Sequence, residues 1–356
     1  MGIVRFENIE VESIRGSASV GGWESTGAII NDQEEATYCR RAELFHRMEG
    51  AGVWDEKERV GMRGFIMPRA VTFDRRQSRT EVTIATSHIF LQNAGLQGIF
   101  FSKQGAPANP HQMVDPTLGR IVYHIVHDHT NIGDWVDLSG IDQSGSTAVD
   151  VYAVRESQNL WSTIKDIGDN EFYVAYFTRD DRLMYRCHPM FAASLPEPVL
   201  TIDTDSILGQ PTINYRDWVR PDQAQLYALT DTGATLKAEY PANLGVEGRR
   251  HREDHLRCNS QARLNQLAQR LYLFLQRDYN VSVSLPGSCG LAMDLYDRVE
   301  MTYAGTARNG VTVNWSQKKF WIEQITVQRT HRFGAVTELT LEEENWTSPY
   351  MYTDYT

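Results

Sequence analysis

Three histidines and an aspartate crowd into one short stretch of the chain, and they are the residues best suited to chemistry. The stretch reads His-Ile-Val-His-Asp-His, which makes His124, His127, Asp128 and His129 candidate metal ligands. Imidazole and carboxylate groups are ordinary zinc ligands, and a zinc ion held by three such groups can activate a water molecule. A metal-dependent hydrolase centred on this cluster is therefore one hypothesis for the function.

The spacing of the cluster argues against that hypothesis. Hydrolases of the metallo-β-lactamase type use His-x-His-x-Asp-His, whereas this chain has His-x-x-His-Asp-His. Leu118, Ile121, Val122 and Ile125 recur at helical period and predict a helix that begins at Asp115-Pro116. On that helix His124 and His127 share the polar face, while His129 turns toward the apolar face. Histidines near the end of a helix also interact favourably with its dipole, so we expect surface histidines and no metal.

Other signatures of catalysis are missing from the sequence. It contains no Gly-x-Ser-x-Gly elbow and no Walker loop. The Gly-rich residues 16–27 lack the context of a nucleotide site and are predicted to form a loop. Asp180 and Asp181 are predicted to lie in a solvated hairpin turn rather than to act as glycosidase carboxylates. We therefore name no catalytic, cofactor-binding or metal residue, and we expect no cofactor.

Composition limits the remaining classes. The 356 residues carry a net charge of −11, which argues against a sequence-reading nucleic-acid binder but not against a surface past which DNA slides. No apolar run reaches the roughly 20 residues that a membrane span needs, and residues 1–12 do not resemble a signal peptide. Cys39, Cys187, Cys258 and Cys289 lack Cys-x-x-Cys spacing, so we expect buried, reduced thiols.

The elements with the most regular patterns occupy residues 259–341. An apolar stripe predicts a helix over residues 260–278, and it consists of Leu264, Leu267, Ala268, Leu271 and Leu275. Alternation predicts a strand over 281–285, which Pro286-Gly287 ends, and a second strand over 296–302. A hairpin of strands 320–328 and 335–341 follows.

This order resembles the C-terminal part of tail hub proteins of tailed bacteriophages. That family includes the baseplate hubs of contractile tails and the hub-like part of type VI secretion spikes. Its members have an Ala/Leu helix, a strand that ends in Pro-Gly, a Gly-Asp-x-Val-like strand start and a hairpin that closes a small barrel. Asp297-Arg298-Val299 matches the middle of this pattern, and Tyr296 stands where the family often has Gly.

A short internal repeat agrees with the resemblance. Residues 80–84 (Thr-Glu-Val-Thr-Ile) recur as residues 337–341 (Thr-Glu-Leu-Thr-Leu), and each follows an apolar strand, led by Phe65-Ile66 or Trp321-Ile322. Tail hub proteins contain two related tube domains, one near each end of the chain. The resemblance therefore implies a β-rich α+β fold, in which two related small β-barrel or sandwich tube domains flank an inserted mixed α/β domain.

The domain boundaries follow from the same resemblance. We expect a first tube domain in residues 1–110, an outer α+β domain in 111–198, a second tube domain in 199–345 and a C-terminal arm in 346–356. The second tube domain would contain the helix 260–278 and a loop insertion near 235–258. Residues 3–11 and 299–303 are candidates for open strand edges, which subunits of a ring would cover, and residues 213–218 look like a strand edge.

The resemblance implies a structural phage tail protein and not an enzyme. Tail hubs form trimeric rings that join the tail tube or distal tail protein to a spike, fibre or tail-tip protein. DNA and the tape measure protein pass through the lumen without specific binding. We therefore expect assembly in the host bacterial cytoplasm and localisation in the virion, at the tail tip or baseplate. A carbohydrate-binding β module using Trp135, Trp315 or Trp346 is a further alternative.

Overall fold

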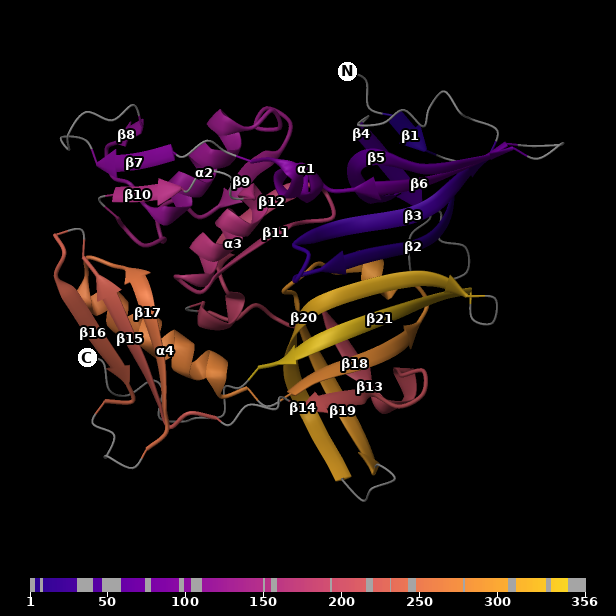
Figure 1. Cartoon of the computed structure of the whole chain (residues 1–356). Helices are drawn as coiled ribbons and strands as arrows, with labels where there is room; N and C mark the ends of the chain where they lie inside the picture. Colours follow the sequence, from indigo (N-terminus) through magenta and orange to yellow (C-terminus); the bar gives the residue numbers. More distant parts are fainter. Residues whose placement is uncertain are drawn as a thin grey trace.

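The computed structural model describes most of the chain and is dominated by β-strands. The residues it describes are 4–6, 9–30, 41–46, 59–73, 78–95, 99–103, 111–149, 151–154, 159–192, 194–215, 220–230, 232–242, 248–277, 279–306, 312–330 and 334–344. These strands form several sheets, and α-helices are few (Figure 1). The predicted β-rich α+β class is confirmed. No helix of the described residues is long and apolar enough to cross a membrane.

One twelve-stranded sheet, the main sheet, joins the two ends of the chain. Its N-terminal half contains β1 (Val4–Phe6), β2 (Ile9–Ser17), β3 (Gly22–Ile30), β4 (Arg41–His46), β5 (Arg59–Phe73) and β6 (Ser78–Ala85). Its C-terminal half contains β13 (Leu200–Asp203), β14 (Thr212–Tyr215), β18 (Tyr279–Pro286), β19 (Arg298–Thr306), β20 (Thr312–Thr330) and β21 (Gly334–Glu343). The halves meet where β2 pairs antiparallel with β20, and Figure 1 draws the two groups one above the other.

The two halves of the main sheet have the same topology. The first runs β1-β4-β5-β6-β3-β2, and the second runs β13-β19-β20-β21-β18-β14. In each half the first of these pairings is parallel and the other four are antiparallel. Matching strands also follow one another in the same order along the chain. The short sequence repeat is therefore part of a duplication of six strands.

The registers of the two halves agree as well. In β6, Ile84 lies between Ile66 of β5 and Ser25 of β3. In β21, the matching Leu341 lies between Ile322 of β20 and Val281 of β18. The prediction that the hairpins containing Thr80 and Thr337 are related is confirmed.

Burial explains why these segments form strands. Alternate residues of β18 are buried, and they include Val281, Val283 and Leu285. They join Ile14, Trp23, Ile66, Ile84, Phe320, Ile322 and Leu341 in one apolar core beneath the main sheet. Alternation at period two is what a sheet with one buried face requires.

A second core lies beside the main sheet and contains three helices, α1 (His88–Asn93), α2 (Leu118–His129) and α3 (Leu160–Asp169). They pack with two three-stranded sheets, which comprise β7 (Ile99–Lys103), β8 (His111–Met113), β10 (Val151–Val154), and β9 (Asp137–Ile141), β11 (Tyr173–Phe177), β12 (Arg182–Cys187). The predicted stripe of α2 is buried here, and the core also takes in Leu91 and Phe101, which precede residue 111.

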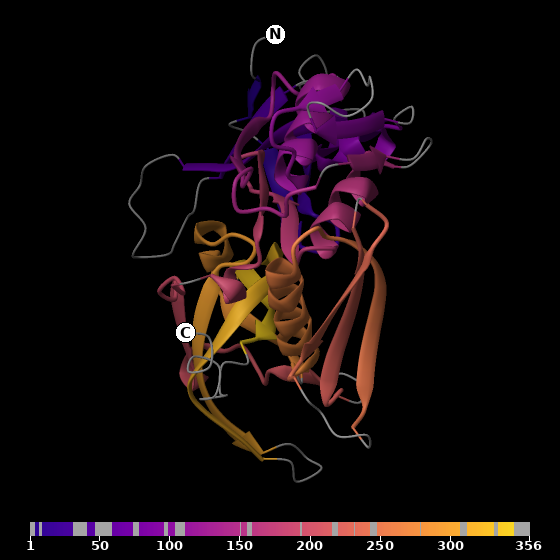
Figure 2. The same cartoon turned by 90° about the vertical axis from the view of Figure 1, so that its left-hand side faces the viewer.

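A third core lies under the remaining helix, α4 (Gln261–Leu275). The apolar stripe of α4 packs on the sheet of β16 (Thr235–Tyr240), β15 (Gln223–Leu229) and β17 (Arg250–Arg257). Figure 2 shows α4 between this sheet and the main sheet. Ser260 caps the helix by accepting a hydrogen bond from the backbone N–H of Arg263.

Two predicted loops are strands in the structure. Residues 235–258 were expected to form a loop insertion because of their charge, yet they supply β16 and β17. In β17 the charged Arg250, Arg252 and Asp254 point to solvent, as charged residues of an edge strand commonly do.

Residues 16–27 contain most of the β2–β3 hairpin. A Cβ atom at Gly16 would collide with the Trp23 ring, so this glycine allows close packing rather than a loop.

Candidate functional site

The histidine cluster is partly assembled on α2. The Nδ1 atoms of His124 and His127 each lie 2.5 Å from one carboxylate oxygen of Asp128. All three side chains are partly exposed on the polar face of the helix. Burial acts to raise the pKa of Asp128, but the hydrogen bonds from the two histidines leave it below its usual value. His129 instead faces inward and contacts the Phe101 ring edge-on, as its place in the helical pattern predicted.

These residues do not converge with further ligands. Among the described residues, no group of three or more His, Cys, Asp and Glu side chains has the geometry of a metal site. The helix begins after Thr117, whose hydroxyl accepts a hydrogen bond from the backbone N–H of Arg120, and not at Asp115. The chemistry available at this cluster is a hydrogen-bonded carboxylate between two imidazoles on a solvated surface.

The aromatic residues proposed for carbohydrate binding lie in different parts of the molecule. Trp135 is 47% exposed and leans on Phe65. Trp315 of β20 stacks on Tyr279 with 5.7 Å between ring centroids and is partly buried against the main core. Trp346 lies outside the described residues. The two described tryptophans therefore do not share one binding platform.

The cysteines carry no disulfide among the described residues. Cys258 is buried, whereas Cys187 and Cys289 are partly buried, so the expected full burial holds only for Cys258. Burial raises the pKa of all three thiols, which keeps them protonated and unreactive. Cys39 lies outside the described residues.

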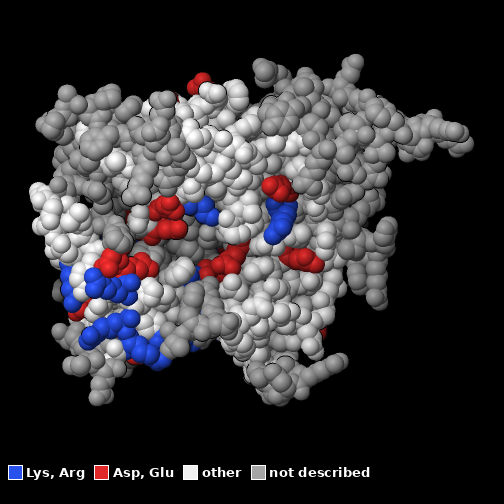
Figure 3. Space-filling view, in the orientation of Figure 1, with Lys and Arg blue, Asp and Glu red and all other residues white. Residues whose placement is uncertain are grey.

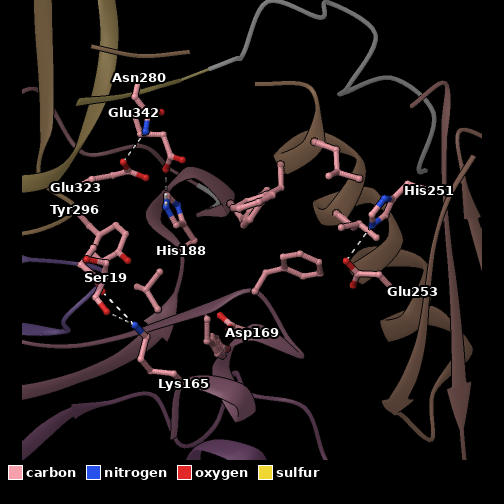
Figure 4. A pocket seen from close by; sticks show the side chains of 18 of the residues that line it. Ser19, Lys165, Asp169, His188, His251, Glu253, Asn280, Tyr296, Glu323 and Glu342 are labelled. Atoms are coloured by element: carbon pink, nitrogen blue, oxygen red, sulfur yellow. Dashed lines mark hydrogen bonds and ion pairs between the residues drawn. The ribbon is translucent and has the colours of Figure 1, made fainter. Parts of the chain in front are cut away.

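A hollow with a volume of about 1150 Å³ lies where the three cores meet. Figure 4 shows side chains entering it from α3, from α4, from the main sheet and from β17. Its apolar wall includes Phe172, Phe191, Leu271, Phe274 and Leu275. Acidic groups are prominent in its polar part, and Figure 3 shows red atoms gathered around the hollow.

The polar groups of the hollow are engaged with one another. His188 Nε2 lies 3.7 Å from Glu342, and the same carboxylate forms an ion pair with the buried Arg277. Burial lowers the pKa of His188 in spite of this neighbour. Lys165 donates a hydrogen bond to the carbonyl oxygen of Ser19, 2.7 Å away, and Asn280 donates one to Glu323. The contacts of Lys165, His188 and Arg277 tie the second and third cores to the main sheet.

Glu171 is the centre of another contact between cores. Its buried carboxylate accepts hydrogen bonds from Tyr185, from the hydroxyl of Ser146 and from the backbone N–H of Thr147. Burial raises its pKa. Arg263 of α4 reaches the same carboxylate at 3.4 Å, so the third core is fixed to the second. This site could not be predicted from the sequence, because its residues are far apart in the chain and follow no motif.

The hairpin turn before β12 is also a structural contact. Asp181 was predicted to be solvated, but it is buried and has a positive φ of 64°. Its carboxylate accepts hydrogen bonds from the backbone N–H and the hydroxyl of Ser87. This aspartate therefore joins the β11–β12 hairpin to the start of α1, which is a structural and not a glycosidase role.

The ends of the main sheet are candidates for assembly. Among the described strands, β1 pairs only with β4, and β14 pairs only with β18. Strands β1 and β14 are thus edges within the predicted residues 3–11 and 213–218, whereas residues 9–11 begin β2, which lies between β3 and β20. The prediction for residues 299–303 is wrong, because β19 lies between β13 and β20. Tyr215 of β14 is 61% exposed, which is unusual for a large aromatic residue on an open strand.

Searches with family models and against curated proteins found no match. The fold, however, is similar to solved tail proteins. A tail protein from Neisseria meningitidis MC58 aligns with a TM-score of 0.61 at 14% identity, over 94% of this chain and 92% of that one. The 43 kDa tail protein of prophage MuSo2 from Shewanella oneidensis aligns with a TM-score of 0.60 at 9% identity, over 95% of both chains.

A secretion protein has the same fold. The E. coli type VI secretion component described as similar to the T4 bacteriophage tail proteins gp27 and gp5 aligns with a TM-score of 0.52 at 8% identity, over 94% of this chain and 74% of that one. At such low identities the likeness concerns the fold alone. The chain therefore has the fold of phage tail proteins and of a type VI secretion component, which confirms the resemblance seen in its sequence.

Proposed function

We propose that the chain is a structural component of a phage tail, a trimeric baseplate or tail-tip hub. In this role it joins the tail tube or distal tail protein to the spike or fibre apparatus and forms part of the DNA ejection channel. The two halves of the main sheet are the tube units. Residues 111–198, together with α1 and β7, form the outer domain.

The duplicated sheet is the observation that carries this proposal. A chain with two equivalent six-strand units offers two equivalent positions around a ring axis. Three such chains give six positions, which suits a three-fold hub seated against a six-fold tube. An interface of this kind is heterologous and closes into a ring. The buried polar contacts at Glu171 and Glu342 support a structural role, because they hold the three cores in one arrangement.

The decisive experiment is a cryo-EM map of the tail that contains this protein. Three copies around the tail axis, at the end of the tube, are expected. Any other copy number, or a position away from the axis, would overturn the hub assignment. Elemental analysis of protein purified without chelator provides an independent check, since stoichiometric zinc or iron would favour the hydrolase hypothesis.

A further inference from the structure

The two halves of the main sheet are joined by the pairing of β2 with β20, which is called the joint below. The duplication provides a second, equivalent pair of strand edges in each chain, and these edges are unpaired among the described residues. Inside the chain, β2 pairs with the second half of β20, with Ser13 opposite Gln328 and Ile14 opposite Val327. By the duplication, β14 corresponds to β2 and β5 corresponds to β20. A pairing of β14 with β5 would therefore repeat this joint, but within one chain the two strands do not meet.

The equivalent residues can be assigned from the ladders. Ser13 pairs with Thr26 of β3, as Thr212 pairs with Ser282 of β18. Those β3 and β18 residues hold matching places beside Thr83 and Thr340. Thr212 is therefore the counterpart of Ser13, and Ile213 that of Ile14. On the other strand, Val71 pairs with Thr80 as Val327 pairs with Thr337, which makes Val71 the counterpart of Val327 and Thr72 that of Gln328.

Both strands have the required side open among the described residues. From residue 67 onward, β5 pairs only with β6, whereas the matching part of β20 has β21 on one side and β2 on the other. On β14 only the side facing β18 is paired. Figure 1 places β14 near the lower end of the main sheet and β5 near its upper end, an arrangement suited to head-to-tail contact.

The side chains of β14 are exposed as expected for a strand that lacks a neighbouring strand on its open side. Ile14 in the closed joint is 1% exposed, but its counterpart Ile213 is only partly buried. Tyr215 in the same short strand is exposed. Open strand edges with apolar side chains invite further pairing. A strand added there would supply the main-chain partners that β2 finds in β20.

We propose that β14 of one copy pairs antiparallel with β5 of a second copy, with Ile213 opposite Val71 and Thr212 opposite Thr72. The inference rests on the proposed ring-forming function and names the strands that close the ring. Every unit of the ring then meets the next through one kind of joint, formed alternately within and between chains. The main sheet thereby becomes continuous around the axis.

Disulfide trapping tests the register. The pair Thr212→Cys with Thr72→Cys should give covalent oligomers under mild oxidation, because residues opposite each other in a ladder lie within disulfide reach. The matched control is Ser13→Cys with Gln328→Cys, a pair that occupies the same place in the joint within the chain. It should form a disulfide inside one chain, so two free thiols are lost and no covalent oligomer forms. The pair Thr212→Cys with Ala70→Cys is out of register. This pair, and each variant with a single added cysteine, should form few cross-links.

The possible outcomes test the pairing of β14 with β5 separately from the trimeric state of the ring. A covalent ladder that ends at three chains supports both. A ladder that ends at another number supports the joint and overturns the trimeric hub. No cross-linking at the highest soluble concentration, while the Ser13–Gln328 control closes, overturns the joint, since a disulfide traps even a transient pair. A trimer seen by mass photometry in that same sample would leave the hub proposal standing.

Discussion

Tyr296 adopts a backbone conformation that is usually found at glycine. Its φ is 62°, in the left-handed region, where the family often has Gly. The ring lies 5.1 Å from both Tyr176 and His188 between ring centroids. A left-handed conformation costs a non-glycine residue about 1–2 kcal/mol. Tyr296 is partly buried and packs against the main core, and removing a packed aromatic side chain costs about 3–5 kcal/mol. Packing therefore outweighs strain at this position.

The first prediction concerns Tyr296→Gly. Although this variant relieves the backbone, it should lower the free energy of unfolding by about 2 kcal/mol, the difference between the two effects. Urea denaturation measures it, with Tyr296→Phe as the control that keeps the ring. A glycine variant as stable as the wild type would show that strain, and not packing, dominates here.

Asp294 should make the stability of the fold depend on pH. Burial, reinforced by Asp297, raises the pKa of Asp294 to about 7 from its ordinary 3.8. Its Oδ1 accepts hydrogen bonds from the Leu295 backbone N–H and from Trp23 Nε1. Because the folded state binds this proton more tightly, the group contributes stability below about pH 4 that is lost as the pH rises to about 7.

Asp294→Asn is the second prediction. The amide oxygen can keep both hydrogen bonds but cannot ionise, so at pH 8 the variant should be more stable than the wild type by about 1 kcal/mol or more. At pH 4 the difference should vanish. Chemical denaturation at the two pH values measures this, and the exposed Asp205→Asn should change neither. A variant that is less stable than wild type at pH 8 would contradict the assignment.

At the scale of elements, the sequence predicted those helices and strands whose apolar residues recur at a regular period. Helices α2 and α4 and the hairpin of β20 and β21 were found, because each buries one face and alternates regularly. Strand β17 was missed, since a partly exposed edge strand rich in charge has no apolar alternation to reveal it. The β2–β3 hairpin was missed because its glycines serve packing, which composition cannot distinguish from a loop.

The third prediction concerns how α4 is attached. Glu171→Ala should lower the free energy of unfolding by about 3 kcal/mol or more, because it leaves Arg263 and Tyr185 facing a buried site without their carboxylate. Arg263→Ala should cost only about 1 kcal/mol, since three hydrogen bonds to Glu171 remain.

A surface pair provides the control for this comparison. Arg249 and Asp222 are both exposed, and their nearest charged atoms are 3.5 Å apart, so Arg249→Ala should be close to neutral. Denaturant unfolding of the three variants should therefore rank Glu171→Ala as clearly the most damaging. Equal effects of Glu171→Ala and Arg249→Ala would mean that α4 does not depend on this contact.

At the scale of the whole molecule, the sequence hinted at the duplication without revealing it. Only residues 80–84 and 337–341 are visibly alike. Elsewhere matching positions differ in type, as with Gly27 and Val283 beside Val82 and Leu339. A sheet requires a repeated pattern of burial and pairing rather than repeated residues. For the same reason the open sides of β5 and β14 could be recognised only once the ladders were known.

The last prediction concerns the passage of DNA through the ring. Duplex DNA carries one negative charge about every 1.7 Å, so a basic wall would hold it, whereas an acidic wall would let it move. The chain has 46 acidic and 35 basic residues. Figure 3 shows much of the visible basic surface gathered at lower left, over the β15–β17 sheet, and acidic groups nearer the centre of this face. We therefore expect the bore of the proposed ring, which the main sheet would line, to be negative.

Two measurements test this expectation. The electrostatic potential calculated along the bore of the assembled ring should be negative, and duplex DNA should migrate unchanged in a gel-shift experiment at low ionic strength. Low salt is the stringent condition, because it strengthens any contact between phosphates and basic side chains. If DNA is retained, replacing Arg249, Arg250 and Arg252 with Ala shows whether the outer sheet is responsible. Retention that survives those replacements, or a positive bore, would contradict passage without binding.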